Sequence, residues 1–191
     1  MPNEEYISTD TVREKLITAG ITELEEHGFS DFSLRRVAAA SNVSCAAPYK
    51  HFKNKEDFIG AIVDYIHSQW IMLSEQILSI FKGDTKKQLV ELCVAYTRFC
   101  MGNIHFRSVI MMDFGTIAAD KPDIKQHINQ CIKDMTIAYC KDNGLSEDEH
   151  RQMAFRINAM VQSTALLTDN TMSNEEAVEM LREAIEYELN K

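Results

Sequence analysis

The sequence contains few residues that interrupt or cross-link a chain. Its 191 residues include only seven glycines and three prolines, which excludes collagen-like and linker-dominated proteins. No run of about 18 uncharged apolar residues occurs, and the first residues combine neither a basic flank nor an apolar core. We therefore expect a cytoplasmic protein that is not associated with a membrane. The five cysteines are odd in number and show no pairing pattern, which indicates reduced thiols.

The charged residues are distributed unevenly. The chain has 29 acidic and 20 basic residues, and its net charge of −9 by itself argues against a nucleic-acid partner. Residues 32–55, however, contain five basic residues and no acidic one, whereas the other 167 residues contain 15 basic and 29 acidic ones. A local basic segment on an acidic chain is typical of a DNA-reading module. A chance cluster on a solvated surface is the alternative.

Apolar residues recur at intervals of three and four throughout the chain. This periodicity predicts an all-α protein of about nine helices. We expect helices at residues 11–27, 34–40, 45–52, 55–82, 85–101, 104–113, 122–142, 147–169 and 174–189. Capping boxes open the first helix at Thr11 and the last two at Ser146 and Ser173. The helix at 55–82 would be about 40 Å long, enough to join two domains.

Residues 34–52 have the arrangement of a helix-turn-helix unit. Two short helices are separated by a turn of about three residues, Ser41 to Val43, and follow a longer packing helix. In such a unit the second helix lies in the major groove, and small residues let the two short helices cross closely. The small residues here are Ala38, Ala39, Ala46 and Ala47. Asn42 lies where a left-handed backbone is needed, a conformation that asparagine tolerates.

These residues carry a resemblance to a known family. The segments concerned are Gly28-Phe29, Ser33-Leu34-Arg35-Arg36-Val37-Ala38, Asn42-Val43-Ser44 and Tyr49-Lys50-His51-Phe52-Lys53-Asn54-Lys55-Glu56. Over residues 9–60 the chain resembles the DNA-binding module of the TetR (tetracycline repressor) family. The resemblance implies an N-terminal three-helix DNA-binding domain, residues 1–54, and a larger helical ligand-binding and dimerisation domain, residues 55–191. It also implies a homodimeric repressor that releases double-stranded operator DNA when a small molecule binds.

The resemblance further implies roles for individual residues. Those expected to contact phosphate are Ser33, Arg36, Tyr49, His51 and Lys55, each a hydrogen-bond donor or a cation. Those expected to face the bases are Cys45, Ala46, Ala47, Pro48 and Lys50. Ser44, as the cap of the recognition helix, completes the DNA-binding set. Core packing is the alternative for Tyr49 and His51, and it is the expected role of Phe52.

Two residues depart from a simple helix-turn-helix pattern. The family commonly has glycine in the turn where this chain has Asn42, which the backbone argument tolerates. Pro48 conflicts with a helix that begins directly after Ser44, because at the fourth helical position a proline removes the first intrahelical donor. Either the recognition helix starts late or its first turn is irregular.

The C-terminal part is rich in large, soft and aromatic side chains, which line apolar ligand cavities in many proteins. The candidate ligand-binding residues are Trp70, Tyr96, Phe99, Cys100, His105, Met112, Asp113, Phe114, Asn158 and Gln162. They predict a small apolar or amphipathic effector whose orientation is fixed by the polar members of the set. Ordinary core packing is the alternative for each of them. Asp113 is either a cap for the following turn or a counter-charge for a cationic ligand.

The last two helices are the expected dimer interface. One recognition helix reads too few base pairs, so two copies related by a twofold axis are needed for two half-sites. The apolar positions that would form a four-helix bundle are Met153, Ile157, Met160, Val161, Thr164 and Leu167 on one helix and Val178, Leu181, Ala184, Ile185 and Leu189 on the other. The alternative is that both stripes seal the core of a single chain.

Other classes of protein have less support in the sequence. There is no glycine-rich phosphate loop and no Gly-x-Ser-x-Gly, His-Glu-x-x-His or Cys-x-x-Cys motif, so we expect neither an enzyme nor a bound cofactor. The six histidines lack the spacing of a metal site. Cys93 and Cys100 share a helical face and leave a thiol-responsive regulator as an alternative. An interaction protein without DNA binding would lack the basic residues Lys50, Lys53 and Lys55.

Overall fold

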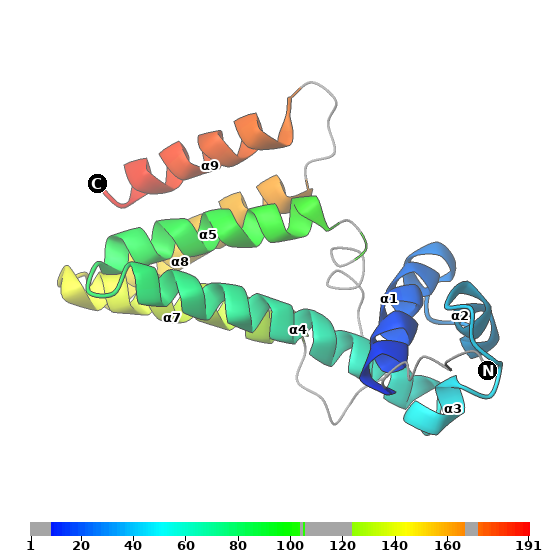
Figure 1. The fold of residues 1–191 in the computed structure, drawn as a ribbon. Helices are drawn as coiled ribbons and strands as arrows, with labels where there is room; N and C mark the ends of the chain where they lie inside the picture. Colours follow the sequence, from blue (N-terminus) through cyan, green and yellow to red (C-terminus); the bar gives the residue numbers. More distant parts are fainter. Residues whose placement is uncertain (1–8, 104, 106–123, 167–171) are drawn as a thin grey trace. The chain divides into compact units, whose positions relative to one another are not determined.

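The computed structural model describes residues 9–103, 105, 124–166 and 172–191, which contain eight helices and no strand (Figure 1). The all-helical fold class expected from the sequence is confirmed. The described residues divide into two compact units, one of residues 9–66 and one of residues 67–103, 105, 124–166 and 172–191. No helix among them is long and apolar enough to cross a membrane.

The first unit is built around α1, Thr9–His27, which packs on two short helices. These are α2, Leu34–Ala40, and α3, Pro48–His51. They are followed by α4, Lys55–Ile80, whose first half completes this unit and whose second half, from His67, belongs to the other. The buried residues of α1 and of the start of α4 are Leu16, Ile17, Ile21, Leu24, Phe58, Ile59 and Ile62.

The helices α1 and α4 approach each other closely at Gly20. A Cβ atom at Gly20 would lie 2.3 Å from Cε1 of Phe58 and 2.9 Å from Cδ1 of Ile62, closer than real side chains come. The missing side chain therefore leaves room for the buried Phe58 ring. The same ring meets Phe52 edge-on, with the ring centroids 4.3 Å apart, so the residue that ends α3 is packed against α4.

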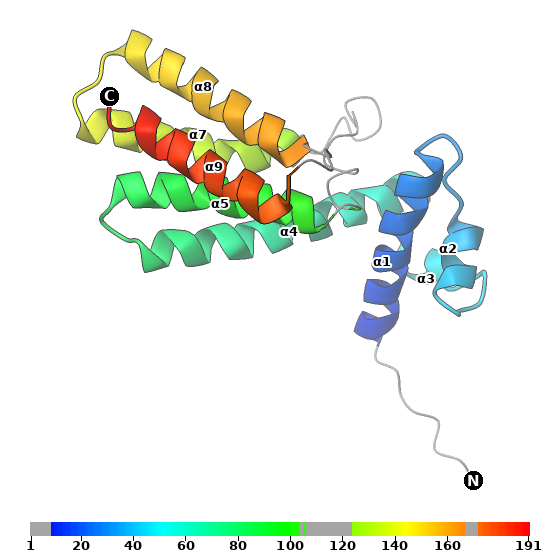
Figure 2. The same cartoon turned by 90° about the horizontal axis from the view of Figure 1, so that it is seen from above.

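The second unit has α5, Thr85–Gly102, at its centre. This helix packs against α7, Ile124–Asp142, and also against α8, Glu147–Leu166, and α9, Asn174–Glu188. Figure 2 shows α8 and α9 side by side. The large buried residues of α5 are Leu89, Leu92, Cys93, Tyr96 and Cys100, and the second half of α4 adds Trp70.

Two helix starts follow the sequence signals closely. The backbone N–H of Ser146 donates to Glu149 at 2.8 Å, and the backbone N–H of Ser173 donates to Glu176 at 2.8 Å. In return the hydroxyl of each serine accepts the backbone N–H of its glutamate. These reciprocal bonds are capping boxes, and the boxes expected at Ser146 and Ser173 are confirmed.

Other expected boundaries differ or lie outside the described residues. The capping box expected at Thr11 is wrong, because α1 already begins at Thr9 and includes Thr11 in its first turn. The helix expected at 104–113 lies outside the described residues apart from His105. The boundary expected between residues 54 and 55 stays a prediction, while the division into compact units falls after Ile66, inside α4.

Candidate DNA-binding surface and ligand site

A Schellman turn ends α2 and directs the chain toward α3. The N–H of Val43 donates to the carbonyl of Ala38 at 3.0 Å, and the N–H of Asn42 donates to that of Ala39 at 3.1 Å. This pair of bonds requires a left-handed residue just after the helix. Asn42 supplies it with a φ of 54°, which confirms the backbone conformation expected from the sequence.

The recognition helix starts later than the sequence pattern suggests. α3 begins at Pro48, in the first helical position, where the absent N–H of proline leaves no bond unmade. Before it, the N–H of Ala47 donates to the carbonyl of Ser44 at 2.8 Å, which closes a turn. The late start considered above is confirmed. A helix from residue 45 with Ser44 as its cap is wrong, because it would place Pro48 where a donor is needed.

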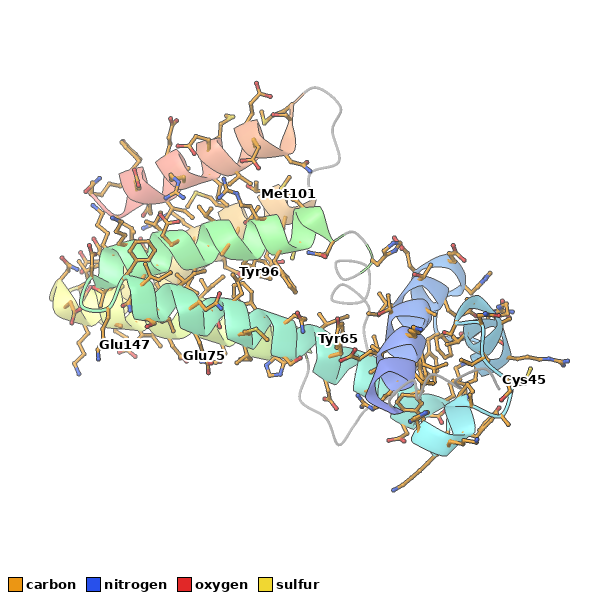
Figure 3. The ribbon with its side chains drawn as sticks, in the orientation of Figure 1. Cys45, Tyr65, Glu75, Tyr96, Met101 and Glu147 are labelled. Atoms are coloured by element: carbon orange, nitrogen blue, oxygen red, sulfur yellow. The ribbon has the colours of Figure 1, made fainter. Side chains whose placement is uncertain are left out.

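The side chains of α3 divide between solvent and core. Tyr49 is 63% exposed and Lys50 is also exposed, whereas Pro48 and Phe52 are buried. Phe52 therefore packs in the core as expected, and Tyr49 does not. Cys45, in the turn before α3, is exposed and lies at the outer edge of its unit (Figure 3).

Three further residues of the expected DNA-binding set complete this surface. Ala46 is exposed, and Ala47 and His51 are half-buried. Lys53, just after α3, is exposed as well and adds a basic group to the same segment. The contacts of all these residues with DNA stay predictions.

Arg36 is already bound to acidic residues of its own unit. Its Nε donates to Glu23 of α1 at 2.8 Å, and its guanidinium also pairs with the carboxylate of Asp31. Glu23 is only 6% exposed and accepts the N–H of Ser33 at 2.9 Å. The hydrogen bond to Glu23 raises the pKa of Arg36. Arg36 thus ties α1 to α2, Ser33 caps α2, and the phosphate contacts expected of both stay predictions.

Two other basic residues have aromatic partners. Nζ of Lys55 lies 4.5 Å from the centroid of the Phe29 ring and donates to the carbonyl of Ser30 at 3.4 Å. The guanidinium of Arg13, on α1, lies 5.5 Å from the centroid of the Phe52 ring. Arg13 is therefore beside the end of α3. Sequence reasoning missed it because this position results from the packing of α1 and not from the acid-free segment.

Five of the expected ligand residues meet inside the second unit. The ring of Trp70 meets that of Tyr96 edge-on with centroids 5.5 Å apart, and the centroid of Phe99 is 5.9 Å away. The hydroxyl of Tyr96 accepts a hydrogen bond from Gln162 at 3.5 Å and shares another with Cys100. These residues come from α4, α5 and α8; Figure 3 marks the position of Tyr96 on α5.

Two other residues of the expected ligand set are described and lie at the surface. His105 and Asn158 are exposed. Met112, Asp113 and Phe114 lie outside the described residues.

The cluster contains polar groups that are shut off from water. The indole N–H of Trp70 is fully buried and has no hydrogen-bond partner among the described residues. Burial raises the pKa of the Tyr96 phenol, so this group stays protonated at neutral pH. Both groups are therefore uncharged hydrogen-bond donors within an apolar core.

All five cysteines are free, and their surroundings differ. Cys45 is exposed, Cys131 is half-buried, and the other three are buried. Burial raises the pKa of Cys93, Cys131 and Cys140. Because the thiolate is the reactive form, a raised pKa makes these three thiols less reactive at neutral pH, and the thiol-responsive alternative stays a prediction.

Most residues expected at the dimer interface face the interior of their own unit. The buried ones are Met153, Ile157, Val161, Val178, Leu181, Ile185 and Leu189. For six of them, an interface role is wrong, and the alternative of a sealed single-chain core is confirmed. The seventh, Leu181, also lines a surface groove together with Met160, Thr164 and Ala184 of the expected set, so for these four the interface role stays a prediction. Leu167 lies outside the described residues.

An outer set of apolar residues that the sequence pattern did not predict is exposed on α8 and α9. Phe155 is 74% exposed, Met180 58% and Tyr187 68%. Met180 is also one of the residues that line a groove of about 420 Å³, which are Ala159, Met160, Ser163, Thr164, Met172, Ala177, Met180, Leu181 and Ala184. Sequence reasoning missed the outer set because it counted one stripe per helix, although Phe155 and Ala159 repeat at helical spacing on a second face.

The geometry of the first unit is that of a helix-turn-helix unit within an all-helical protein. Residues 16–62 match the family model described as bacterial regulatory proteins of the tetR family. This match spans α2, the Schellman turn, α3 and the start of α4. Residues 16–62 are therefore similar to the DNA-binding module of the TetR family, and the resemblance seen in the sequence is confirmed.

Solved structures extend this likeness to the whole fold. The TetR-family transcriptional regulator PfmR from Thermus thermophilus is 17% identical and has a TM-score of 0.71, covering 92% of this chain and 97% of its own. A TetR-like transcriptional regulator from a Rhodococcus species is 11% identical, with a TM-score of 0.73 and coverage of 100% and 98%.

The transcriptional regulator FadR from Bacillus subtilis, solved in complex with stearoyl-CoA, is 15% identical, with a TM-score of 0.66 and coverage of 92% and 97%. At these identities the shared feature is the fold: an N-terminal helix-turn-helix unit followed by a helical C-terminal domain. No curated protein matches the chain in sequence.

Proposed function

We propose that this chain is a ligand-responsive transcriptional repressor that leaves its operator when a small apolar or amphipathic molecule binds to its second unit. The observation that carries the proposal is the recognition segment. A Schellman turn at Asn42 is followed by a short helix with Tyr49 and Lys50 exposed. A helix placed in this way, on a unit that matches the TetR family, fits the major groove of B-DNA.

The proposed DNA contacts fall into two groups. Those to phosphate are Arg13, Ser33, Arg36, Tyr49, His51 and Lys55, and those to the bases are Ser44, Cys45, Ala46, Ala47 and Lys50. Phosphate contacts fix the register of the protein, and base contacts read the sequence. Arg13 joins the first group because it lies beside the end of α3. Pro48 is buried, so its proposed role is to start α3.

The proposed assembly is a homodimer that uses the outer faces of α8 and α9. Phe155, Met180 and Tyr187 are large apolar side chains exposed on these two helices, and an apolar patch of this kind would be covered in a complex of two copies. The groove beside Met180 is lined mainly by small and apolar residues, which allow helices of a second copy to approach closely. Two copies related by a twofold axis would present two recognition helices to two half-sites.

The proposed effector site is the cluster around Trp70. Its aromatic and uncharged polar groups suit a molecule that is mainly apolar and carries few polar atoms. FadR, in its complex with stearoyl-CoA, is an example of this fold with an amphipathic ligand. That example supports the class of effector proposed here.

The proposed switch acts through α4, which has buried residues in both units. Phe58 belongs to the core of the first unit and Trp70 to that of the second. An effector that contacts Trp70 therefore contacts the helix that continues into the DNA-binding unit. To act as an inducer it must bind the DNA-incompetent state more tightly, and a coupling of about 1–3 kcal/mol weakens operator binding about 5- to 150-fold.

Titration of fluorescently labelled duplexes from the neighbouring genomic DNA tests the proposal. The full-length protein is expected to bind one of these fragments with an affinity that falls as salt rises, because phosphate contacts release counterions. Tyr49→Ala and Lys50→Ala should each weaken binding by about tenfold through lost hydrogen bonds to charged or base groups.

The matched control is Lys141→Ala, which removes the same charge from the exposed end of α7. It should bind the operator like the wild type. If no double-stranded fragment binds in a salt-dependent manner, or if Lys141→Ala loses as much affinity as Lys50→Ala, the proposed DNA contacts are wrong.

A further inference from the structure

The second half of α4 holds a buried hydrogen-bond donor without an acceptor. The side chain of Trp70 is fully buried, and its Nε1–H has no partner in the described part of the chain. Nearly all buried donors in folded proteins are paired, because an unpaired one loses its bonds to water without compensation. The ring of Tyr96 meets that of Trp70 edge-on, and a ring face is at best a weak acceptor.

A second donor in the same place is only weakly satisfied. The phenol of Tyr96 accepts a long hydrogen bond of 3.5 Å from Gln162. Its other described partner is the sulfur of Cys100, and sulfur forms weak hydrogen bonds. The two donors therefore belong to rings that are in contact, and both retain capacity for a stronger acceptor.

The ring and hydrogen-bond partners named for these two donors are uncharged. They are the rings of Phe99, Trp70 and Tyr96, the amide of Gln162 and the thiol of Cys100. An anion placed among them would lose its hydration without gaining a cationic partner from this set. A neutral carbonyl oxygen would lose less and would satisfy the indole N–H. Aromatic rings at edge-to-face distances also favour an aromatic guest.

We propose that the Trp70 cluster binds a neutral aromatic molecule with a carbonyl oxygen, which accepts the hydrogen bond of Trp70 Nε1. This inference rests on the proposed function for the role of the molecule as effector, and it adds the chemical class. Trp70 fixes the carbonyl, Tyr96 offers a second donor, and Phe99 packs against the ring of the guest.

The experiment uses the fact that the chain contains a single tryptophan. In ¹⁵N-labelled full-length protein the indole N–H therefore gives one resonance. Acetophenone is the probe, ethylbenzene is the matched molecule without an acceptor, and benzoate is the matched anion. Acetophenone is expected to move the indole proton downfield in a saturable manner, as a new hydrogen bond does. Ethylbenzene should cause no such downfield shift, and benzoate should not bind.

Trp70→Phe keeps an aromatic ring and removes the donor. By calorimetry this variant should bind acetophenone about fivefold more weakly than the wild type, the loss expected for one neutral hydrogen bond. Its affinity for ethylbenzene should be unchanged. If Trp70→Phe does not fold, the wild-type resonance alone decides. The inference is overturned if acetophenone does not shift the indole resonance. It is also overturned if Trp70→Phe lowers the affinity for acetophenone and for ethylbenzene equally.

The outcomes also separate this inference from the proposed function. If the protein binds DNA but its Trp70 resonance does not respond to acetophenone, the proposed DNA binding stands and the proposed ligand class is wrong. If the indole resonance responds but the protein binds no duplex, the proposed ligand class stands and the proposed function is wrong.

Discussion

At the scale of single residues, Gly20 is a position that has no room for a side chain. The ring of Phe58 occupies the space that a side chain at Gly20 would need, and that ring is itself held by Phe52 and by the core. Gly20→Ala should therefore destabilise the protein by about 1–3 kcal/mol, the usual cost of overpacking, even though alanine is the better helix former. Urea unfolding followed by circular dichroism measures this change.

Gly102→Ala is the matched control for that experiment. Gly102 is the last residue of α5, and a Cβ atom there would meet no atom of the described residues within 4 Å. The substitution should leave stability unchanged or raise it by less than about 1 kcal/mol. Equal destabilisation by both substitutions would mean that the contact with Phe58 does not set the cost.

Single residues also show which parts of the site a sequence can reveal. The left-handed conformation of Asn42 was predictable because it depends on local backbone sterics. The conflict at Pro48 was visible too, since a proline has fixed local requirements. The partners of Arg36 and Arg13 were not predictable, because Glu23 and Phe52 reach them only through the packing of α1.

At the scale of helices, a half-buried ion pair between Glu91 and Arg182 joins α5 to α9. Nη2 of Arg182 donates to Glu91 at 2.9 Å, and a second bond joins Nη1 to the other carboxylate oxygen. Both side chains are half-buried, and the hydrogen bond to Arg182 lowers the pKa of Glu91 below its ordinary value of 4.5. The pair should therefore stabilise the second unit at neutral pH.

The sign of the pH dependence follows from this lowered pKa. A carboxyl group with a lower pKa in the folded chain stabilises the fold above its unfolded value, and this contribution is lost as pH falls through the folded value. Glu91→Gln should cost about 1 kcal/mol at pH 7, and the difference from the wild type should shrink below about pH 4.5. Thermal unfolding at several pH values measures it.

Glu183→Gln, at an exposed position of α9, is the control for the loss of one negative charge. It should change the melting temperature little at any pH. If the difference between Glu91→Gln and the wild type stayed constant on acidification, the ion pair would not be its source.

Helix positions were well predicted from the sequence, whereas helix faces were less so. Interior periodicity and serine caps placed α8 and α9 within a few residues, because both signals act within one or two turns. The same periodicity does not say which of two apolar stripes faces the core. On α8, Met153 and Phe155 are two residues apart, yet the first is buried and the second exposed.

At the scale of the whole molecule, the proposed dimer depends on that second stripe. Met180 lines the groove on the outer face and is not part of the buried core of α9, so a charge at this position should be compatible with the folded monomer. In a twofold interface, Met180→Glu would bring two unpaired carboxylates into an apolar contact. We expect it to weaken dimerisation about a hundredfold, because uncompensated charges at an interface cost several kcal/mol.

Ile80→Glu introduces the same charge at an exposed apolar residue at the end of α4, away from this groove. Sedimentation equilibrium should find the wild type and Ile80→Glu as dimers and Met180→Glu as a folded monomer. Because one recognition helix contacts a single half-site, the monomer should also lose operator affinity while every DNA-contacting side chain is intact. If Met180→Glu is still a dimer, the proposed interface on α8 and α9 is wrong. If it is a monomer that binds the operator as tightly as the wild type, operator binding does not require the dimer.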